Sequence, residues 1–417
     1  MPCGGLTRRL GHAKRLRFKS SPGPPMASVR SLAALGISAA GSRRRCRSAS
    51  RPQNASIFYN FPVKTRDAII IGAGIIGLSL AIELRKRGAR VLIVERGEPG
   101  REASHAAAGM LVECATETPA ALQPLAWASA RMYPEFAHEL QDESGINVDL
   151  RDAGALVFPP PEHVHDRPGF TTESLLPAPL AELEPTLADP NRPAFLLKER
   201  SVDPRALTAA ALKAAKHRDV DISSGSAVTG VLVSDGRVSG VSTNKTQYAA
   251  PVVVNCAGAW AGQLPPHSFP TRPVKGQMLA VADASRHLLR HVIRAPEVYI
   301  VPRSDGRILI GATVEEAGYD KRTDPSTIHR MHQSAIRMVP ALAQARVLEA
   351  WAGLRPGTPD DLPILGPTGT PGYLVATGHF RDGILLAPVT AQVMAQVITG
   401  VRSEHDLSAF SPGRFHN

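Results

Sequence analysis

Three glycines and one glutamate near the start of the folded region have a spacing suited to holding a dinucleotide. Residues Gly72-Ala73-Gly74-Ile75-Ile76-Gly77 read GxGxxG, and Glu95 follows 18 residues after Gly77. In such a turn the first glycine permits a tight bend, the second lets the backbone approach a pyrophosphate, and the third allows close packing of a helix on a strand. An acid placed like Glu95 accepts hydrogen bonds from a ribose diol. Glycines can also be spaced this way by chance, so the motif has to be weighed with the elements around it.

Those elements form a βαβ unit. The β-branched run 67–71 predicts a buried parallel strand, and 90–95 predicts a second one. Between them, Ile75–Lys86 has the apolar spacing of a helix that stops before Gly88. The glycine turn then lies at the N-terminus of this helix, whose free N–H groups and dipole favour phosphate. The sequence therefore predicts a Rossmann-like dinucleotide-binding domain.

A run of small residues follows the second strand. Residues 101–111 read REASHAAAGML and contain no proline. Small side chains let a backbone lie close to a flat ring system or its sugar chain. Composition alone equally favours a tightly packed core helix, and both interpretations remain open at this point.

The charge of the chain is unevenly distributed. The protein has 417 residues, enough for two or three lobes, with 43% hydrophobic residues and a formal net charge of +11. Residues 1–66 hold 14 of the 48 Lys and Arg residues and none of the 37 Asp and Glu residues, so the remaining 351 residues carry a net charge of −3. The folded body therefore gives no electrostatic reason to expect a nucleic-acid partner.

The basic extension 1–66 is rich in Arg, Ser, Pro and Gly, and we expect it to be disordered. It also resembles an organelle transit peptide, and it is compatible with a reading frame that begins at Met26 or later, or with an arm that binds nucleic acid. A secretory signal is less favoured because Arg43, Arg44 and Arg45 follow the short apolar stretch. We expect a cytoplasmic protein, or one of an organelle matrix if this extension is a transit peptide.

Cysteine and histidine spacing argues against metal and disulfide chemistry. The four cysteines, Cys3, Cys46, Cys114 and Cys256, include no CxxC pair, which excludes a disulfide framework or a cysteine-rich zinc site. We expect no metal site. No run of 18 apolar residues is present, so we expect no stable membrane insertion.

Further elements can be placed along the chain. Asp203 and Pro204 mark the start of a helix over 205–217, and 252–255 reads as a strand. Residues 299–302 and 307–311 flank Ser304-Asp305-Gly306 as a β-hairpin. Residues 119–140 have a helical pattern despite Pro124 and Pro134, and the proline-rich range 159–193 is expected to be irregular.

Seven blocks over about residues 67–400 resemble the D-amino-acid oxidase superfamily of FAD-dependent amine oxidases. Within it, the chain is most similar to the glycine oxidases of thiamine (thiazole) biosynthesis. The matching blocks are IIIGAGIIGLSLA (69–81), ASHAAAGML (103–111), VVVNCAGAWA (252–261), RPVKGQML (272–279), YIVPRSDGRILIGAT (299–313), WAGLRPGTPDDLPILG (351–366) and GHFRDGILLAP (378–388).

The resemblance implies an α/β fold (α+β overall) with two domains. A Rossmann-like FAD-binding domain, discontinuous in sequence, is expected over 67–118, 198–262 and 353–402. A substrate domain built on an antiparallel sheet is expected over 119–197 and 263–352. Residues 403–417 would form a C-terminal tail.

The resemblance also implies three substrate-binding residues. Arg355 occupies the family position of the fork that binds the substrate carboxylate, and arginine suits this role because its planar guanidinium donates at two points. Tyr299 matches a tyrosine whose hydroxyl reaches the same carboxylate, and Arg381 matches a second arginine near the substrate. Without the resemblance, Arg355 reads as a surface residue of a Pro/Gly loop and Tyr299 as a sheet tyrosine facing water. Beyond Gly383 we expect an apolar helix over about 384–398 whose N-terminus points at the flavin.

Oxidation of an amino acid by a flavin transfers a hydride from the α-carbon, so we expect no catalytic acid or base beyond an unprotonated substrate amine. The segment 351–355 contains no cysteine, unlike relatives that carry the flavin covalently, so FAD should be non-covalent. The resemblance places cofactor contacts at Gly72, Gly74, Ile75, Ile76, Gly77, Glu95, Arg96, Ala103, Ser104, Ala108, Gly109, Met110, Val228, His379, Phe380, Arg381, Asp382, Gly383, Ile384 and Leu385.

Several functions follow from this resemblance. The first is oxidative deamination of glycine, sarcosine or small D-amino acids by oxygen to the imine, glyoxylate, ammonia and hydrogen peroxide, in support of thiazole synthesis. Alternatives are a D-amino-acid dehydrogenase, an oxidase of a glycine-like group on tRNA, and a flavin-binding protein without turnover. We expect a small amino acid and oxygen as partners and no nucleic acid, while homo-oligomerisation remains open.

Overall fold

The predicted βαβ unit is present at the start of the folded region. In the computed structural model of the chain it consists of β1 (Ala68–Ile71), α1 (Ile75–Lys86) and β2 (Val91–Val94). β1 and β2 are parallel, and all their residues are buried, as the continuous apolar runs predict. Between β1 and α1, Gly72 has a φ of 103°, and a Cβ there would lie 2.6 Å from the Cys256 carbonyl oxygen. Only glycine fits this turn without strain.

The structure describes residues 66–113, 118–159, 176–177, 179–282 and 287–415. The predicted disordered extension 1–66 lies outside the described residues except for Arg66. Of the range 159–193, predicted to be irregular, residues 160–175 and 178 lie outside them as well, and the remainder contains β5 (Leu176–Pro177) and α4 (Leu180–Leu183). Among the described residues, no helix is long and apolar enough to cross a membrane.

A six-stranded sheet is assembled from three distant stretches of the chain. Its order is β18-β19-β12-β1-β2-β8, and all neighbours are parallel except β18 and β19. The four further strands are β8 (Asp221–Ser223), β12 (Val253–Asn255), β18 (Ile364–Pro367) and β19 (Tyr373–Thr377). This arrangement confirms the prediction of a Rossmann-like domain that is discontinuous in sequence.

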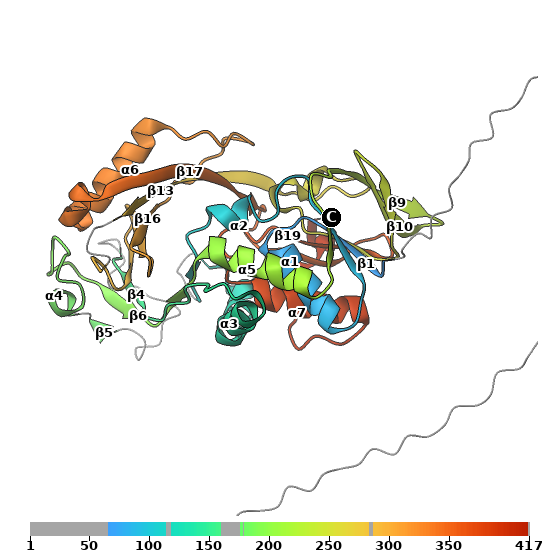
Figure 1. Cartoon of the computed structure of the whole chain (residues 1–417), viewed down its shortest axis with the longest axis horizontal. Coiled ribbons are helices and arrows are strands. Elements are labelled where there is room, and N and C mark those ends of the chain that lie inside the picture. Colours follow the sequence, from blue (N-terminus) through green and yellow to red (C-terminus); the bar gives the residue numbers. More distant parts are fainter. Residues whose placement is uncertain (1–65, 114–117, 160–175, 178, 283–286, 416–417) are drawn as a thin grey trace, which may run out of the picture. The chain divides into compact units, whose positions relative to one another are not determined.

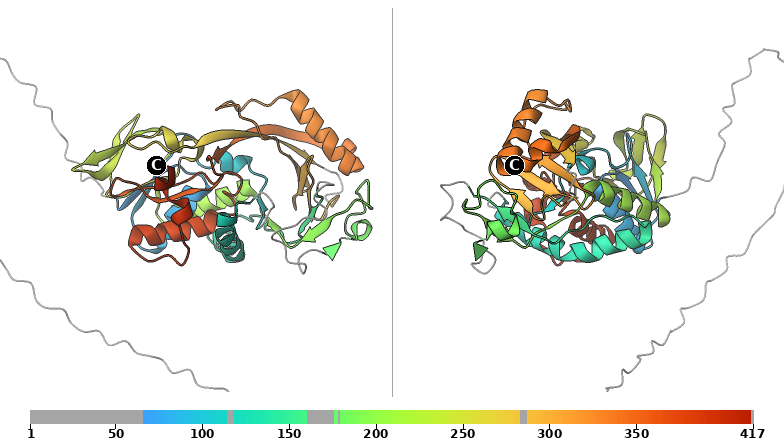
Figure 2. Two further views of the ribbon diagram at one scale, coloured as in Figure 1. Left: turned by 180° about the vertical axis from the view of Figure 1, so that it is seen from behind. Right: turned by 60° about the vertical axis from the view of Figure 1, so that its left-hand side comes forward.

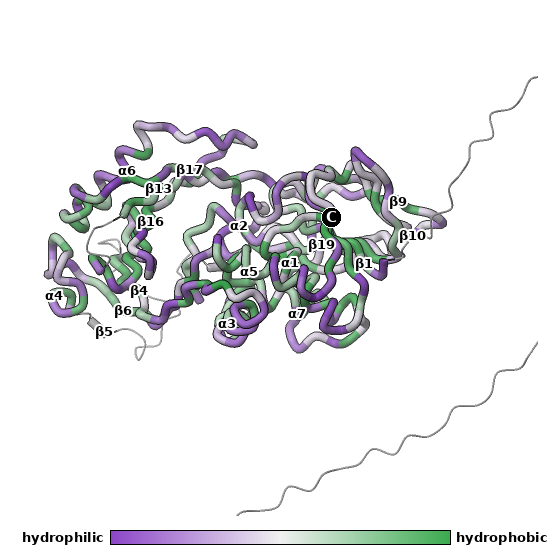
Figure 3. The backbone as a smooth tube through the Cα atoms, in the orientation of Figure 1, coloured by the Kyte–Doolittle hydropathy of each residue, from purple (hydrophilic) through white to green (hydrophobic). Residues whose placement is uncertain are grey.

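Different layers cover the two faces of this sheet. On one face pack α1, α3 (Gln123–Ser144), α5 (Pro204–His217) and α7 (Ala387–Thr399), which share one apolar core. On the other lies a three-stranded antiparallel sheet of β9 (Val228–Ser234), β10 (Arg237–Thr243) and β11 (Gln247–Ala249). Figure 3 shows strongly hydrophobic backbone along β1, in the layer between the two.

Helix α3 forms as predicted but packs with the helices of the first domain. Leu125, Tyr133 and Leu140 of α3 belong to the same apolar core as α1 and α7. We expected this helix, as part of residues 119–197, in the second domain, and the boundaries of both domains stay predictions. Through Ser129 and Tyr133, α3 hydrogen-bonds to the carbonyls of Leu385 and Ile384, just before α7.

A second, eight-stranded sheet has the order β17-β13-β16-β15-β14-β4-β6-β5 and is antiparallel except where β14 meets β4. It confirms the predicted domain with an antiparallel sheet, and β15 and β16 form the predicted hairpin. Its strands are β4 (Ala155–Val157), β5, β6 (Phe195–Leu197), β13 (Arg272–Ala282), β14 (Val292–Arg294), β15 (Tyr299–Pro302), β16 (Arg307–Gly311) and β17 (Arg346–Gly357).

The faces of this second sheet differ in what covers them. Helix α6 (Pro325–Met338) packs on β13 and β16 on one face, as the views in Figures 1 and 2 show. On the other face Met278, Tyr299 and Val301 pack with Ala108 and Met110 of the first domain. The second face therefore meets the run of small residues.

Short elements complete the fold. These are α2 (Ala103–Ala106), β3 (Met110–Leu111), β7 (Arg200–Ser201) and the 3₁₀ helices Ala120–Leu122, Gly258–Gln263, Pro340–Gln344, Ser408–Phe410 and Pro412–Phe415. In the predicted C-terminal tail, Phe410 is buried in the apolar core of the first domain, and Arg414 forms an ion pair with Asp360.

Candidate functional site

A cleft of about 1600 Å³ is lined by residues of both the six-stranded and the eight-stranded sheet domains. Of the predicted site residues, Gly77 and Leu385 alone are absent from its lining. Those that line it are Gly72, Gly74, Ile75, Ile76, Glu95, Arg96, Ala103, Ser104, Ala108, Gly109, Met110, Val228, Tyr299, Arg355, His379, Phe380, Arg381, Asp382, Gly383 and Ile384.

Gly77 does not line the cleft but allows α1 to pack closely on the turn after β1. A Cβ at Gly77 would overlap the Gly72 carbonyl oxygen and approach Ile70 at 3.2 Å, so glycine lets α1 lie directly on the turn after β1. This is the role that the motif predicts for its third glycine.

Glu95 is held at one end of the cleft by the turn it faces. Its Oε2 accepts from the Ala73 amide at 2.8 Å and its Oε1 from the Gly97 amide at 2.9 Å. Each carboxylate oxygen retains acceptor capacity after one hydrogen bond. The carboxylate is therefore fixed in place and can still accept from a hydroxyl in the cleft.

The N-terminus of α1 faces the same cleft. Gly74 is its N-cap and supplies no capping side chain, while the Ile75 amide donates to Ser104 Oγ at 3.0 Å. A Cβ at Gly74 would lie 3.3 Å from Ser104 Oγ, so a side chain there would narrow this space. Backbone donors and the helix dipole at such a site attract anions.

Arg96 is stacked on an aromatic ring that sequence reasoning did not single out. Its Cζ lies 3.6 Å from the ring centroid of Trp260, and its Nη2 pairs with Glu102 at 2.8 Å. The ring centroids of Trp260 and Tyr319 are in turn 5.3 Å apart. Trp260 could have been singled out from the sequence, because it lies in the block 252–261 that resembles the family.

Arg355 lies in the cleft wall at the end of β17. Its Nη1 donates to the Thr313 carbonyl at 3.1 Å and to the Lys275 carbonyl at 3.4 Å. Burial lowers the pKa of Arg355, yet arginine remains protonated at neutral pH. The two carbonyls fix one end of the guanidinium, so its other donors can meet Tyr299 and an anion in the cleft.

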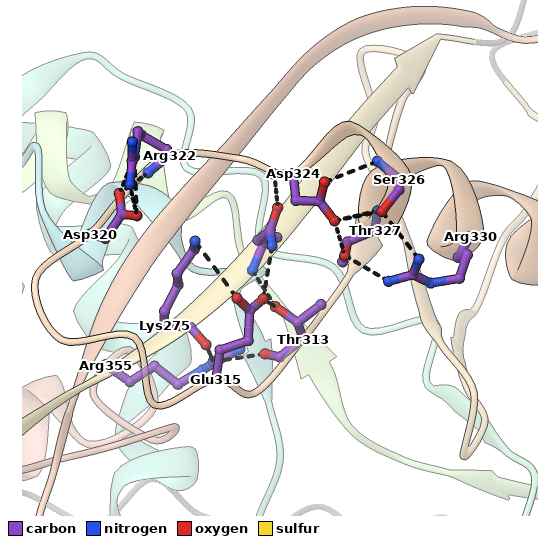
Figure 4. Close-up of polar contacts among 11 residues, drawn as sticks. Lys275, Thr313, Glu315, Asp320, Arg322, Asp324, Ser326, Thr327, Arg330 and Arg355 are labelled. Atoms are coloured by element: carbon purple, nitrogen blue, oxygen red, sulfur yellow. Dashed lines mark hydrogen bonds and ion pairs between the residues drawn. The ribbon is translucent and has the colours of Figure 1, made fainter.

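A carboxylate network supports the carbonyls that fix Arg355, as Figure 4 shows. Glu315 accepts from Thr313 Oγ1 at 2.5 Å and from Gln277 Nε2 at 2.8 Å, and it lies 3.6 Å from Lys275 Nζ. Partial burial opposes ionisation of Glu315, but these hydrogen bonds and the Lys275 charge lower its pKa. The segment after β16 that carries Thr313 is thereby tied to β13, which carries Lys275.

Gly276 makes room for the guanidinium, which gives a first prediction. A Cβ at this position would overlap Arg355 Nη1. Gly276→Ala should displace the guanidinium and raise KM for the substrate roughly 10- to 100-fold, because small misplacements of a binding group are costly. Steady-state kinetics measures this.

Gly230→Ala is the matched control for that prediction. Gly230 also lies in a strand, and its Cβ would meet only Pro265 at 3.6 Å. KM should be unchanged in this variant. An unchanged KM in Gly276→Ala as well would show that Arg355 does not bind substrate where it now lies.

Tyr299 lies on the cleft-facing side of the same sheet. Tyr299, Gly311 and Met278 are directly opposite one another on β15, β16 and β13. The Tyr299 hydroxyl donates to Met278 Sδ at 3.0 Å, and a Cβ at Gly311 would lie 2.7 Å from its ring. Burial raises the pKa of Tyr299, against the opposing effect of the Arg355 charge, so the phenol is neutral at physiological pH.

The segment 379–384 forms a turn along the opposite edge of the cleft. The Phe380 amide donates to the Pro356 carbonyl at 3.0 Å, which joins this turn to the residue after Arg355. His379 is buried, and its Nε2 lies 3.1 Å from Thr390 Oγ1. Burial lowers the pKa of His379 to about 3, so the imidazole is neutral in the folded protein.

Because His379 is buried in its neutral form, we predict that the free energy of unfolding falls as the pH is lowered. An unfolded histidine titrates near 6.5, so the stability that the neutral His379 permits is complete above that pH and is lost as pH falls toward about 3. At pH 5 the loss amounts to about 2 kcal/mol. His379→Gln should therefore flatten the decline in unfolding free energy between pH 6.5 and 4, measured by urea titration.

His138→Gln serves as the control because His138 has 74% of its side chain exposed. Its acid profile should match that of the parent protein. If His379→Gln declines as steeply as the parent, the acid sensitivity comes from other groups.

The helix predicted from about residue 384 begins three residues later, at Ala387. Residue 388 is proline, so the Ile384 carbonyl has no amide four residues on, and Tyr133 OH donates to it at 2.8 Å instead. Ser129 Oγ donates to the Leu385 carbonyl at 2.6 Å and lies 3.4 Å from the Val389 amide. As a result, a turn supported by α3, and not the first turn of α7, faces the cleft.

The run of small residues is not a core helix. Helical structure covers only Ala103–Ala106, and extended backbone follows. A Cβ at Gly353 would overlap the Ala106 side chain, and Trp351 Nε1 donates to the Ala106 carbonyl at 3.1 Å. Small side chains here let β17 and the cleft wall approach closely. The glycines at 276, 311 and 353 were missed individually, and their only signal was membership in the family-like blocks.

The fold and the cleft define a dinucleotide-binding protein in which a second, antiparallel-sheet domain contributes to the lining of the site. Residues 67–397 match the FAD dependent oxidoreductase (DAO) family, and the chain belongs to this family. The predicted superfamily and cofactor are thereby confirmed: the protein is an FAD-dependent flavoenzyme.

Individual relatives agree. The chain is 38% identical over 84% of its length to the bifunctional protein ThiO/ThiG of Trichormus variabilis, of which it covers 55%. It is 32% identical to the glycine oxidase of Pseudomonas aeruginosa, covering 82% of this chain and 98% of that one. The crystal structure of glycine oxidase from Geobacillus kaustophilus superposes with a TM-score of 0.77 at 31% identity, covering 84% and 99% of the two chains. The chain thus spans about half the length of the ThiO/ThiG protein that it matches.

The described residues fit FAD. Gly74 leaves space before the N-terminus of α1 for phosphate, and Glu95 can still accept from a ribose. Residues 106–109, three alanines and a glycine, line the cleft with little side-chain bulk where a flat ring has to lie.

Proposed function

We propose that the protein oxidises glycine and other small amines, such as sarcosine and small D-amino acids, to the imine and then glyoxylate, with ammonia and hydrogen peroxide as the other products. The observation that carries this proposal is that Arg355 and Tyr299 line the same cleft as the glycine turn and Glu95. The similarity to ThiO/ThiG supports a role in supplying thiamine thiazole synthesis.

The residues at the substrate end would bind and orient the amino acid. Arg355 would donate to the carboxylate, and Arg381 would add positive charge to this region of the cleft. The Tyr299 hydroxyl, which here donates to Met278 Sδ, would turn its proton to the carboxylate as a second hydrogen bond. When bound, FAD would supply the two-electron oxidation chemistry that the protein residues lack. Arg355 and Tyr299 would hold the carboxylate at a fixed point and so orient the α-carbon within the cleft.

We propose no protein acid or base for this reaction. Among the described residues, His379 is the histidine in the cleft lining, and its low pKa makes it unable to hold a proton at neutral pH. Glu95 lies at the nucleotide end, bonded to backbone amides. We propose, as the resemblance implies, that the substrate amine arrives unprotonated.

We also propose that FAD is bound non-covalently. Cys256 is the cysteine among the described lining residues, and burial raises its pKa to about 12, which leaves its thiol protonated and unreactive. Acid precipitation of the holoenzyme should release the flavin into the supernatant. Flavin that stays with the pellet would contradict this proposal.

The experiment that tests the function is a substrate panel with two readouts. Holoenzyme is mixed without oxygen with glycine, sarcosine, D-alanine or D-proline, and bleaching of the flavin is recorded; oxygen is then admitted and peroxide is measured. Bleaching followed by peroxide supports the oxidase. Bleaching without reoxidation by oxygen would favour the dehydrogenase, and no bleaching by any amine would refute the proposal.

We place the enzyme in the cytoplasm, or in an organelle matrix if residues 1–66 act as a transit peptide. Fractionation of cells that produce the full chain, with N-terminal sequencing of the product, tests both. An RNA-linked substrate would instead require salt-dependent RNA binding that is lost on removal of residues 1–60.

A further inference from the structure

A buried arginine behind the cleft wall contacts the segment that faces the cleft. Arg303, at the end of β15, has 2% of its surface exposed and is among the largest fully buried side chains of the described residues. Its Nη2 donates to the Ala108 carbonyl. Its Nε and Nη1 have no hydrogen-bond partner in the part of the chain that the structure describes.

Stability does not explain this arginine. Burial lowers the pKa of Arg303 to about 10, against the opposing charges of Asp203 and Asp149, so the side chain stays charged at neutral pH. A buried charge with two unpaired donors destabilises a fold relative to an apolar side chain of similar size. Apart from the attraction of the Asp203 and Asp149 charges, the interaction that the structure gives this side chain is its hydrogen bond to the Ala108 carbonyl in the cleft wall.

The segment 108–110 is confined on the side away from the cleft. Gly109 has a φ of 78°, and a Cβ there would overlap the Val202 carbonyl oxygen and lie 2.9 Å from Arg303 Nη2. The Val202 amide donates to the Gly109 carbonyl at 2.8 Å, and Met110 pairs with Ser201. Residues 108–110 are therefore held by Arg303, Val202 and Ser201 on the side away from the cleft. Their other side lines the cleft.

The hairpin that carries Arg303 is itself anchored. Ser304 donates from its amide and its hydroxyl to Asp149. Arg307 Nη2 pairs with Asp203, the residue that caps α5 through the Arg205 and Ala206 amides. The hairpin is thus anchored at Ser304 and Arg307, close to Arg303, which restrains the guanidinium beside Ala108.

We propose that Arg303 is a positioning residue for the flavin, which acts through the Ala108 carbonyl to hold residues 108–110 against the ring. The inference rests on the proposed placement of the ring beside this segment. Arg303 does not line the cleft, so its effect on the cofactor would be transmitted by the backbone of residues 108–110 alone.

The test compares Arg303→Met with Arg303→Lys in the absence of substrate. Arg303→Met removes the donor and the charge but keeps similar volume, so the FAD-free protein should keep its Tm within about 2 °C or gain stability. The dissociation constant of FAD should rise about tenfold or more, and the visible absorption bands of bound flavin should shift. Arg303→Lys restores a charged donor and should recover most of the lost affinity.

Arg218→Met is the matched control. It removes ion pairs with Glu139 and Glu143 that lie outside the cleft lining and outside the hairpin of Arg303. It should therefore lower Tm while FAD affinity stays within about threefold and the bands do not move. Should Arg303→Met fail to fold, Arg303→Gln gives the same readouts, because its neutral amide is too short to replace the guanidinium.

Two results would overturn the proposal: parental FAD affinity and bands in the Met or Gln variant, or a Lys variant no better than the Met variant. These readouts need no substrate. A holoenzyme that binds FAD normally but oxidises no amine would refute the proposed function and leave the role of Arg303 intact.

Discussion

Replacing Arg355 by alanine should raise KM for glycine about 100-fold, the effect expected when a charge-assisted, two-point partner of a carboxylate is removed from a partly buried site. The substitution also leaves the Thr313 and Lys275 carbonyls without the Nη1 donor. Steady-state kinetics gives the KM. Acetate, a carboxylate without an amine, should lose affinity by a similar factor in a titration of the flavin spectrum.

Arg322→Ala is the control for this prediction. Arg322 pairs with Asp320 near the same network (Figure 4). Its side chain is 89% exposed. Its removal should leave both constants unchanged. Equal KM and acetate affinity in the parent and Arg355→Ala would remove Arg355 from the substrate site and with it the main support for the proposed function.

Replacing Gly72 by alanine should abolish tight FAD binding. The φ of 103° is unfavourable for any residue with a Cβ, and that Cβ would lie 2.6 Å from the Cys256 carbonyl oxygen, so the turn has to move. FAD affinity should fall at least about 100-fold, because the turn places the backbone against the pyrophosphate, and unfolding should become easier by about 3 kcal/mol. Fluorescence titration with FAD and urea unfolding measure the two effects.

Gly88→Ala is the control that introduces a similar backbone strain at a position away from the glycine turn. Gly88 follows the other end of α1 with a φ of 83°, and no atom lies within 4 Å of the Cβ position. This variant should lose about 1 kcal/mol of stability from the backbone conformation and bind FAD like the parent. Similar losses of affinity in both variants would show that the Gly72 turn acts on FAD only through overall stability.

The nucleotide end of the site was predictable because its signals are local. A strand, a glycine turn, a helix and a second strand fit within thirty residues, so spacing alone places Gly72, Gly74 and Glu95 at one end of β1 and β2. The hairpin of β15 and β16 was readable for the same reason, from two β-branched runs around Asp305 and Gly306. Such signals depend on backbone sterics and capping, which act between near neighbours.

The substrate end was not readable from local pattern. Arg355 in isolation has the features of a surface residue in a Pro/Gly loop, and only the resemblance pointed to its role. Its placement depends on pairing with a strand about eighty residues earlier, where Gly276 leaves room for the guanidinium and Lys275 presents a carbonyl. The support of the turn before α7 was likewise not readable, because the Ile384 carbonyl accepts from Tyr133, 251 residues away.

The amino-acid sequence by itself determined the βαβ unit, the glycine turn and the acid that faces it, because hydrogen bonding and steric limits within a few residues leave little choice there. Only the tertiary structure decided which side chains share the cleft with that turn and which glycines leave space for Arg355 and Tyr299. It also decided that Arg303 hydrogen-bonds to the cleft wall from the side away from the cleft. Those outcomes depend on strand register and on helix packing between segments about 80 to 250 residues apart, which no local pattern encodes.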